Sequence, residues 1–262
     1  MADAKLVKMK DQVYRDPRPK EFFDRYHERS RNEKPNWVYE AVRLVTSLYA
    51  YVFLRARSIG TDNIPQSGPV IIAPNHFSFM DHFLCGAFTR RKLRFMAKSQ
   101  LFTPPMVYIY SPGGVFPVRR GAQDEEAFAT AGKILQDGGV VCMYCEGGRS
   151  RTGDLASKAK PGIGRLALET GATIVPVAIH GSAKVRNWKR LQFPKIIVQY
   201  GEPFRFEQVA APERSQHQAV ADQIFAEITA LYSRLDAEGA DAVAQTVRAQ
   251  RRARRSSRAA AV

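Results

Sequence analysis

Short apolar segments alternate with longer helix-like segments over most of this chain, and this alternation constrains the fold more than any other feature. The strand-like segments are 69–73, 93–97, 140–145, 174–179 and 196–200. The helix-like segments are 81–91, 123–136, one that begins at Pro161, and 216–235. Strands separated by helices pair mainly in parallel, with the crossover helices on the faces of the sheet. We therefore expect an α/β fold with a largely parallel central sheet flanked by helices.

The two ends of the chain differ from this central part. Residues 1 to about 35 mix acidic and basic side chains with little periodicity, which predicts an exposed polar arm. Trp37 to Leu54 is rich in aliphatic and aromatic residues and has basic neighbours, which is typical of a helix in a membrane interface. Packing of this helix on the domain's own core is the alternative. After Leu235 the chain becomes rich in Ala and then Arg, which predicts a tail that is disordered unless it contacts a surface. We expect three parts, namely 1–58, 59–236 and 237–262.

Composition narrows the classes of partner. The 262 residues carry a formal net charge of +15 and are 45% hydrophobic, enough for a folded core. A chain this basic favours anionic partners, and nucleic acid, anionic lipid and phosphorylated substrates all qualify. The first residues lack the apolar core of a secretory signal, and no run reaches the roughly 20 apolar residues of a spanning helix.

The three cysteines, Cys85, Cys142 and Cys145, sit in or beside apolar segments. An odd number outside a small secreted framework indicates a reducing compartment. Cys142 and Cys145 form a C-x-x-C motif, which can bind metal or carry out redox chemistry. However, residues three apart on a strand point to opposite faces, so we expect buried, unpaired side chains.

The first candidate for chemistry is His76, followed by Asp81 five residues later, directly after the strand at 69–73. Ligand sites of open α/β sheets collect at the carboxyl ends of strands. A carboxylate that holds the imidazole in one tautomer makes the ring a base for a hydroxyl proton near neutral pH. Two alternatives remain: a structural His76 with Asp81 capping a helix, and a metal site that also uses His82. The metal site lacks a fourth ligand at suitable spacing.

Two later segments can bind an anion. Residues 113–121 are glycine-rich and end in Arg119 and Arg120, either of which can hold a phosphate in bidentate fashion. The alternative is a turn with two solvated arginines. Residues 146–151 follow a strand and combine Glu146 with two glycines and two arginines. The chain contains neither G-x4-G-K-[ST] nor G-x-G-x-x-G, so chemistry driven by ATP or a nicotinamide cofactor has little support.

The order of these motifs, H-x4-D, G-x-x-F-x-x-R, E-G-x-R-S and an apolar strand with Pro176, resembles the 1-acyl-sn-glycerol-3-phosphate acyltransferase (PlsC-like) family of glycerolipid acyltransferases. The resemblance runs from about Gly60 to Phe204. It implies the glycerolipid acyltransferase fold in 59–236 and transfer of a fatty acyl chain from acyl-CoA or acyl-carrier protein to a lysophospholipid hydroxyl. The implied acceptor is 1-acylglycerol 3-phosphate, with glycerol 3-phosphate or a headgroup-bearing lysophospholipid as alternatives. The implied product, phosphatidic acid, belongs to phospholipid biosynthesis.

The resemblance also implies roles for individual residues. His76 is expected to act as general base and Asp81 to orient it. The residues implied to bind the acceptor are Lys98, Arg119, Glu146, Gly147, Arg149 and Ser150, with Arg119 on the phosphate. The implied reaction uses the acyl thioester as co-substrate and needs no metal or further cofactor.

A lipid acceptor implies that the enzyme works at a phospholipid surface. We expect peripheral or monotopic attachment to the cytoplasmic face of the cell membrane. The basic residues near 184–190 and in the tail can add attraction to an anionic leaflet. Two rivals are a nucleic-acid-binding protein and a non-catalytic lipid-binding protein of the same fold. The tail lacks interleaved aromatic residues and the chain shows no nucleic-acid-binding motif, so we expect no specific nucleic acid partner.

Overall fold

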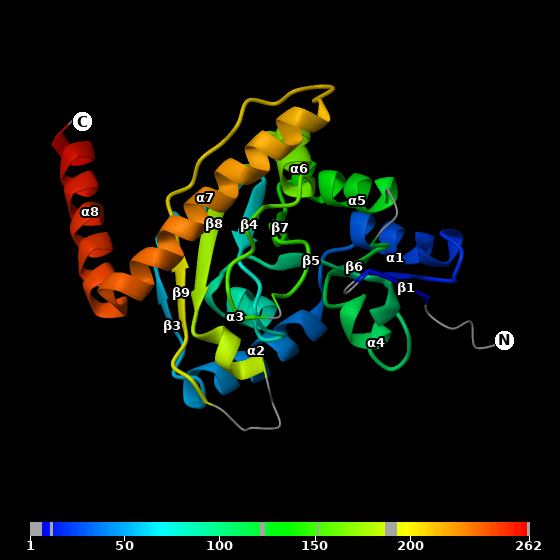
Figure 1. Ribbon diagram of the computed structural model, residues 1–262, viewed down its shortest axis with the longest axis horizontal. Coiled ribbons are helices and arrows are strands. Elements are labelled where there is room, and N and C mark those ends of the chain that lie inside the picture. Colours follow the sequence, from blue (N-terminus) through cyan, green and yellow to red (C-terminus); the bar gives the residue numbers. More distant parts are fainter. Residues whose placement is uncertain (1–6, 11–12, 121–123, 151, 187–192, 261–262) are drawn as a thin grey trace.

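A seven-stranded sheet forms the centre of the computed structural model, which describes residues 7–10, 13–120, 124–150, 152–186 and 193–260 (Figure 1). The strand order is β3-β9-β8-β4-β7-β5-β6, and all neighbours pair in parallel except β8 and β9. The strands are β3 (Arg57–Ile59), β4 (Val70–Pro74), β5 (Leu93–Lys98), β6 (Val115–Val118), β7 (Val140–Cys142), β8 (Thr173–His180) and β9 (Ile197–Tyr200). The predicted α/β fold with a largely parallel sheet is therefore confirmed.

Helices cover both faces of this sheet. The helices are α1 (Glu21–Asn32), α2 (Trp37–Val52), α3 (Asp81–Phe88), α4 (Val107–Tyr110), α5 (Glu125–Gln136), α6 (Gly162–Thr170), α7 (Arg214–Glu238) and α8 (Ala240–Ala260). Helices α5, α6 and α7 pack on one face, and α2 and α3 pack on the other. Strand β4 shows why: Ile71 and Ala73 join the core under α5–α7, whereas Val70 and Ile72 join the core under α2 and α3. A strand buried on both faces reads as a continuous apolar run, as 69–73 does.

The cysteines follow the same division between the two faces. All three are buried and unpaired. Cys142, the last residue of β7, belongs to the core under α2 and α3, and Cys145 belongs to the core under α5–α7. The expected opposite orientation of the C-x-x-C pair is confirmed, although the strand ends at Cys142 rather than at Cys145.

The N-terminal segment is more ordered than its composition predicted. Residues 7–10 and 13–15 form a two-stranded antiparallel sheet, β1 (Val7–Lys10) with β2 (Val13–Arg15). Helix α1 follows, and its Phe23 and Tyr26 are buried against Phe102 and Val107. The prediction of an exposed polar arm was therefore wrong for α1. Most residues of 21–32 are charged or polar, so the short apolar face of α1 that packs on Phe102 and Val107 is not apparent from composition.

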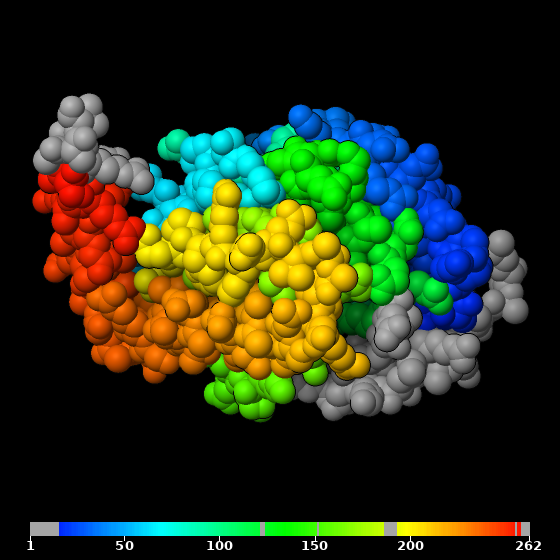
Figure 2. All heavy atoms as spheres, turned by 90° about the horizontal axis from the view of Figure 1, so that it is seen from above, coloured from blue at the N-terminus to red at the C-terminus, as the bar shows by residue number. Residues whose placement is uncertain are grey.

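The C-terminal tail is also more ordered than predicted. A disordered tail was expected over 237–262, but helix α7 continues to Glu238 and α8 follows after Gly239. Val243 is fully buried against Leu235 and the edge of the sheet, and Ala and Arg have high helix propensity. Figure 2 shows α8 at one end of the molecule and the α1 segment at the opposite end.

Helix α2 bears on the question of membrane contact. Among the described residues, no helix is both long and apolar enough to cross a bilayer. One side of α2 packs on the domain through Tyr39 and Ala50, which are buried. Its other side exposes large apolar side chains, including Trp37, Leu44 and Leu48 at 74%, 72% and 63% exposure. Packing on the domain is therefore confirmed for one side of α2. The membrane-interface interpretation stays a prediction for the exposed side. Of the basic segment 184–190, residues Trp188, Lys189 and Arg190 lie outside the described residues.

Candidate active site

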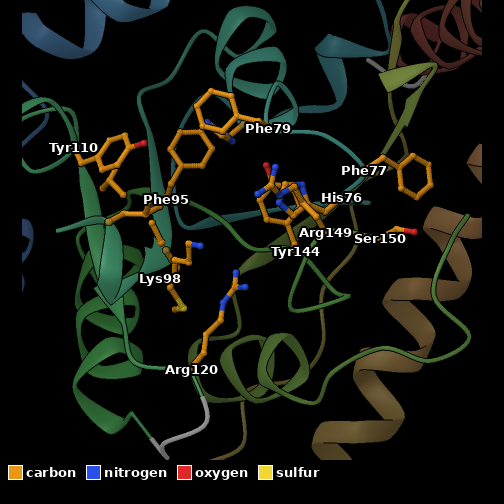
Figure 3. Close-up of a pocket in the computed structure, with 15 residues that line it drawn as sticks. His76, Phe77, Phe79, Phe95, Lys98, Tyr110, Arg120, Tyr144, Arg149 and Ser150 are labelled. Atoms are coloured by element: carbon orange, nitrogen blue, oxygen red, sulfur yellow. The ribbon is translucent and has the colours of Figure 1, made fainter. Parts of the chain in front are cut away.

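A pocket of about 460 Å³ opens at the carboxyl ends of β4, β7, β5 and β6, which are neighbours in the sheet (Figure 3). Each strand or the loop after it supplies part of the lining. The charged and polar lining residues are His76, His82, Lys98, Arg120, Tyr144, Arg149 and Ser150. The apolar lining includes Phe79, Phe95, Met96, Leu101, Tyr110 and Val115. The pocket thus has a cationic part and an aromatic part beside the same histidine.

His76 is placed by the way the chain leaves β4. The side chain of Asn75 accepts the N–H of Ile179 at 2.7 Å and donates to the carbonyl of Ile179 at 3.1 Å. This amide replaces a backbone rung between β4 and β8 just where β4 ends. His76 then turns into the pocket and is 9% exposed.

Asp81 is held by three donors on one oxygen. His76 Nδ1 lies 2.8 Å from Asp81 Oδ2, and the backbone N–H groups of Phe77 and Ser78 donate to the same oxygen at 2.7 Å each. Asp81 is fully buried at the start of α3, where the helix dipole favours a negative charge. A carboxylate can only accept, so His76 carries its proton on Nδ1 and keeps Nε2 as the free basic nitrogen.

The surroundings of His76 keep its ring neutral. The imidazole stacks on the Tyr144 ring with 3.9 Å between centroids and 20° between planes. Burial lowers the pKa of His76 below its ordinary value, although the hydrogen bond and charge of Asp81 act in the opposite direction. Burial also lowers the pKa of His82 to about 3, helped by the nearby His76 and Arg149. His82 is thus a neutral wall residue, and His76 is a neutral base near pH 7.

Three cations line the same pocket, and among them Arg149 lies close enough to His76 to act on its pKa. Figure 3 shows Lys98 and Arg120 extending into the pocket from different segments, with Arg149 above them. Burial lowers the pKa of Lys98, and the charges of Arg120 and Arg149 lower it further. Burial and the charge of Arg149 likewise lower the pKa of Arg120. None of the described residues that line the pocket is acidic, so these charges fit an anionic ligand.

Arg119, which was expected to bind the acceptor phosphate, does not line the pocket, whereas its neighbour Arg120 does. The N–H of Arg119 donates to Asp124 Oδ2 at 2.6 Å, and Asp124 caps α5 through Ala127. Strand β6 ends at Val118, so the two arginines lie in a turn where the alternation of a strand no longer decides which side chain faces inward.

The segment 146–150 divides into a support and a lining part. The Glu146 side chain is buried and does not line the pocket. Burial raises the pKa of Glu146 to about 8, and the charge of Asp81 adds to this. Gly147 has φ +66°, and a Cβ there would lie 2.9 Å from Lys160 Cγ, so the tight turn requires glycine. Arg149 and Ser150 line the pocket, and the Ser150 N–H donates to the His76 carbonyl at 2.8 Å.

Two other nucleophilic side chains near these motifs, Ser78 and Cys145, are buried. The Ser78 hydroxyl accepts the N–H of Met80 at 3.1 Å. Cys145 is fully buried, and burial raises the pKa of its thiol far above the usual value. Within the described ranges, no three His, Cys, Asp or Glu side chains converge to hold a metal ion.

Sequence reasoning missed the aromatic wall and Tyr144. Tyr144 lies in an apolar run that reads as buried strand, so nothing distinguished it from core. Phe95 lies in the strand-like segment 93–97 and reads as core, and Tyr110 comes from α4, where no helical periodicity is visible in the sequence.

Comparison with known proteins identifies the segment that carries the pocket. Residues 55–180, which contain all the charged residues of the site, match a family model described as Acyltransferase. This segment belongs to the acyltransferase family. Helices α1 and α2, like α7 and α8, lie outside the matched acyltransferase segment.

Curated relatives match the acyltransferase segment but not the whole chain. A chloroplastic 1-acyl-sn-glycerol-3-phosphate acyltransferase of Arabidopsis thaliana is 29% identical over 147 residues, which cover 55% of this chain and 41% of the relative. A 1-acyl-sn-glycerol-3-phosphate acyltransferase of Borreliella burgdorferi is 32% identical over 126 residues, 47% of this chain and 50% of the relative. The chain thus spans half the length or less of these relatives. The expected relationship of the segment to the PlsC-like family is confirmed.

A solved structure shares the acyltransferase fold. The crystal structure of the 1-acyl-sn-glycerophosphate acyltransferase PlsC from Thermotoga maritima has a TM-score of 0.58 and 23% sequence identity. The match covers 80% of this chain and 88% of that chain. At this identity the similarity concerns the fold, which extends beyond residues 55–180.

Proposed function

We propose that this chain transfers a fatty acyl group from acyl-CoA or acyl-carrier protein to the free hydroxyl of 1-acylglycerol 3-phosphate, giving phosphatidic acid. The observation that carries the proposal is a single pocket that combines a neutral His76 held by Asp81, three cations and an aromatic wall. The names of the curated relatives support the same acceptor.

The proposed step is direct transfer without an acyl-enzyme. His76 Nε2 takes the proton as the acceptor hydroxyl oxygen attacks the thioester carbonyl carbon. The tetrahedral intermediate then collapses, the C–S bond breaks, and the imidazolium returns its proton to the leaving thiolate. Asp81 stabilises the imidazolium between these two events, and base catalysis of this kind contributes about 10²–10⁴-fold.

The charged and apolar parts of the pocket fit the two ends of the acceptor. Lys98, Arg120 and Arg149 would bind the phosphate, because charge-assisted hydrogen bonds to guanidinium and ammonium groups suit a phosphate dianion. The aromatic wall, with Phe79 and Phe95, suits an acyl chain. Glycerol 3-phosphate would use only the cationic part.

The exposed side of α2 supports action at a membrane surface. Asn36, the N-cap of α2, donates from its backbone to the Pro112 carbonyl at 3.1 Å, which joins α2 to the segment after α4. Helix α4 exposes Tyr108 and Ile109 and supplies Tyr110 to the pocket. Helices α2 and α4 lie along the same edge of the molecule (Figure 1), so a lipid surface at this edge would contact the exposed apolar side chains of both helices. We propose peripheral attachment on the cytoplasmic side, where acyl-CoA and acyl-carrier protein occur.

Purified protein offered labelled acyl-CoA or acyl-carrier protein with a panel of acceptors tests this function. The expected result is labelled phosphatidic acid from 1-acylglycerol 3-phosphate, and its loss in a folded His76→Ala variant. Equal activity of that variant would exclude the base mechanism. A preference for glycerol 3-phosphate or a headgroup-bearing lysophospholipid would replace the proposed acceptor but keep the reaction.

A further inference from the structure

Strand β5, which carries Lys98, is hydrogen-bonded to a segment that precedes the residues matched by the family model. Strand β5 supplies Phe95, Met96 and Lys98 to the pocket, and η2 (Ser99–Leu101) follows it and supplies Leu101. Besides the pairing of β5 with β6 and β7, this stretch is contacted by residues 16–33, which precede the matched segment 55–180.

Arg18 and Asp16 make the fastening at the carboxyl end of β5. Arg18 donates to the carbonyl of Ser99 at 2.7 Å and to the carbonyl of Phe102 at 2.8 Å. Each of these carbonyls belongs to the residue directly after a pocket residue, Lys98 in one case and Leu101 in the other. Arg18 therefore fixes the backbone directly after each of these two pocket residues.

Asp16 holds Arg18 in this position and adds its own contact to the loop. The Arg18 guanidinium donates to both carboxylate oxygens of Asp16, at 2.9 and 2.7 Å, in a bidentate pair. The Ser99 hydroxyl donates to Asp16 Oδ2 at 2.7 Å. The Asp16 side chain is 1% exposed, so the carboxylate of this pair is shielded from solvent. Burial opposes the charge of Asp16, but hydrogen bonds from Arg18 and Ser99 lower the pKa of its carboxyl below the usual value.

The amino end of β5 is fastened to the same segment. Arg94 is buried and donates to the carbonyls of Ser30 and Glu33 at the end of α1, the latter at 2.9 Å. Between the two fastenings, α1 packs Phe23 and Tyr26 on Phe102. Strand β5 is thus held at both ends by one N-terminal unit.

We infer that Asp16 and Arg18 are positioning residues that set the place of Lys98 and Leu101, and hence the affinity of the pocket for a phosphorylated acceptor. The inference rests on the proposed function for the identity of the acceptor, but phosphate binding can be measured without turnover. Residues 16–18 would therefore act on phosphate binding indirectly. They would do so through hydrogen bonds to Ser99 and Phe102 rather than through contact with the ligand.

The test compares Asp16→Asn and Ser99→Ala with Lys98→Gln and with the control Asp137→Asn. Asp137 forms an exposed ion pair with Lys133 on α5, away from the pocket. The full-length variants are measured for the dissociation constant of inorganic phosphate, for KM and kcat with 1-acylglycerol 3-phosphate, and for Tm. Asp16→Asn should weaken phosphate binding and raise the acceptor KM about tenfold, which corresponds to about 1.4 kcal/mol. Its kcat and donor KM should stay within about twofold, because His76 is untouched.

Ser99→Ala removes one hydrogen bond without changing charge and should shift both quantities about threefold in the same direction. If Asp16→Asn fails to fold, the phosphate affinity of Ser99→Ala alone tests the inference. A lower Tm with unchanged phosphate binding in both variants would overturn the inference, because Asp16 would then be merely structural. Phosphate binding that is insensitive to Lys98→Gln would overturn it too. Weakened phosphate binding together with no acylation by the wild type would uphold the inference and refute the proposed function.

Discussion

Exchanging each of two adjacent arginines separately tests whether the pocket binds phosphate. Arg120 lines the pocket and Arg119 does not, so Arg120→Gln and Arg119→Gln form a matched pair with the same loss of charge. A hydrogen bond to a charged group contributes about 1.5–3 kcal/mol. In the wild type, the charge of Arg120 repels Lys98 and Arg149 and lowers the pKa of Lys98. Removing Arg120 relieves this repulsion and so offsets part of the loss. The lower half of that range is therefore the better guide, and kcat/KM should fall about 10–50-fold.

The assay compares 1-acylglycerol 3-phosphate with 1-acylglycerol, which has the same chain and no phosphate. Arg120→Gln should lose activity only with the phosphorylated acceptor, and Arg119→Gln should stay within about twofold for both. Because Arg119 is half-buried, its replacement can also affect stability. The melting temperature of each variant is therefore measured, so that a loss of activity through unfolding is recognised. Equal losses in the two variants, or an equal loss with both acceptors for Arg120→Gln, would refute the assignment of the phosphate to this side of the pocket.

Three further predictions concern the base and the membrane surface. The pKa of His76 is lowered by burial, so kcat/KM should fall with decreasing pH only below about 6.5, as the ring gains a proton. Asp81→Asn should reduce kcat by about 10²–10⁴-fold and move this limb to still lower pH, because Asp81 raises the pKa of His76; a limb at higher pH would contradict this. On α2, Leu48→Glu should weaken binding to anionic vesicles at least about tenfold, since burying a leucine contributes about 1.5–3 kcal/mol. Ala226→Glu, an exposed position on α7, is the control in vesicle sedimentation, and equal binding by both variants would exclude α2 as the contact.

The central part of the fold could be predicted because its periodic signals are strong. The run before His76 is apolar throughout, as expected of a strand buried on both faces, and the loop after such a strand is where a site forms. The pairing of His76 with Asp81 followed from this placement. Strand β6, in contrast, has four residues with a proline at 117, which reads as a turn.

The ends of the chain could not be predicted because their apolar residues are few and their partners are distant in sequence. Phe23 of α1 finds its partner Phe102 only after the sheet has formed. Val243 of α8 is buried by the edge of that sheet, so a composition rich in Arg was misleading. The choice between Arg119 and Arg120 depended on how a turn closes, which is set by the bond from Arg119 N–H to Asp124.

The hydrogen bond from the Ser150 N–H to the His76 carbonyl has a consequence for engineering and for evolution. It joins the loop after β4 to the loop after β7, so the loops that carry His76 and Arg149 form a single structural module. A graft of the His76 loop alone into another α/β scaffold would arrive without its second anchor and without Arg149 beside it. Recombination between family members should therefore preserve function only when both loops are inherited from the same parent. Designers who want a new acceptor have more freedom at β5 and β6, whose side chains reach the pocket from outside this module.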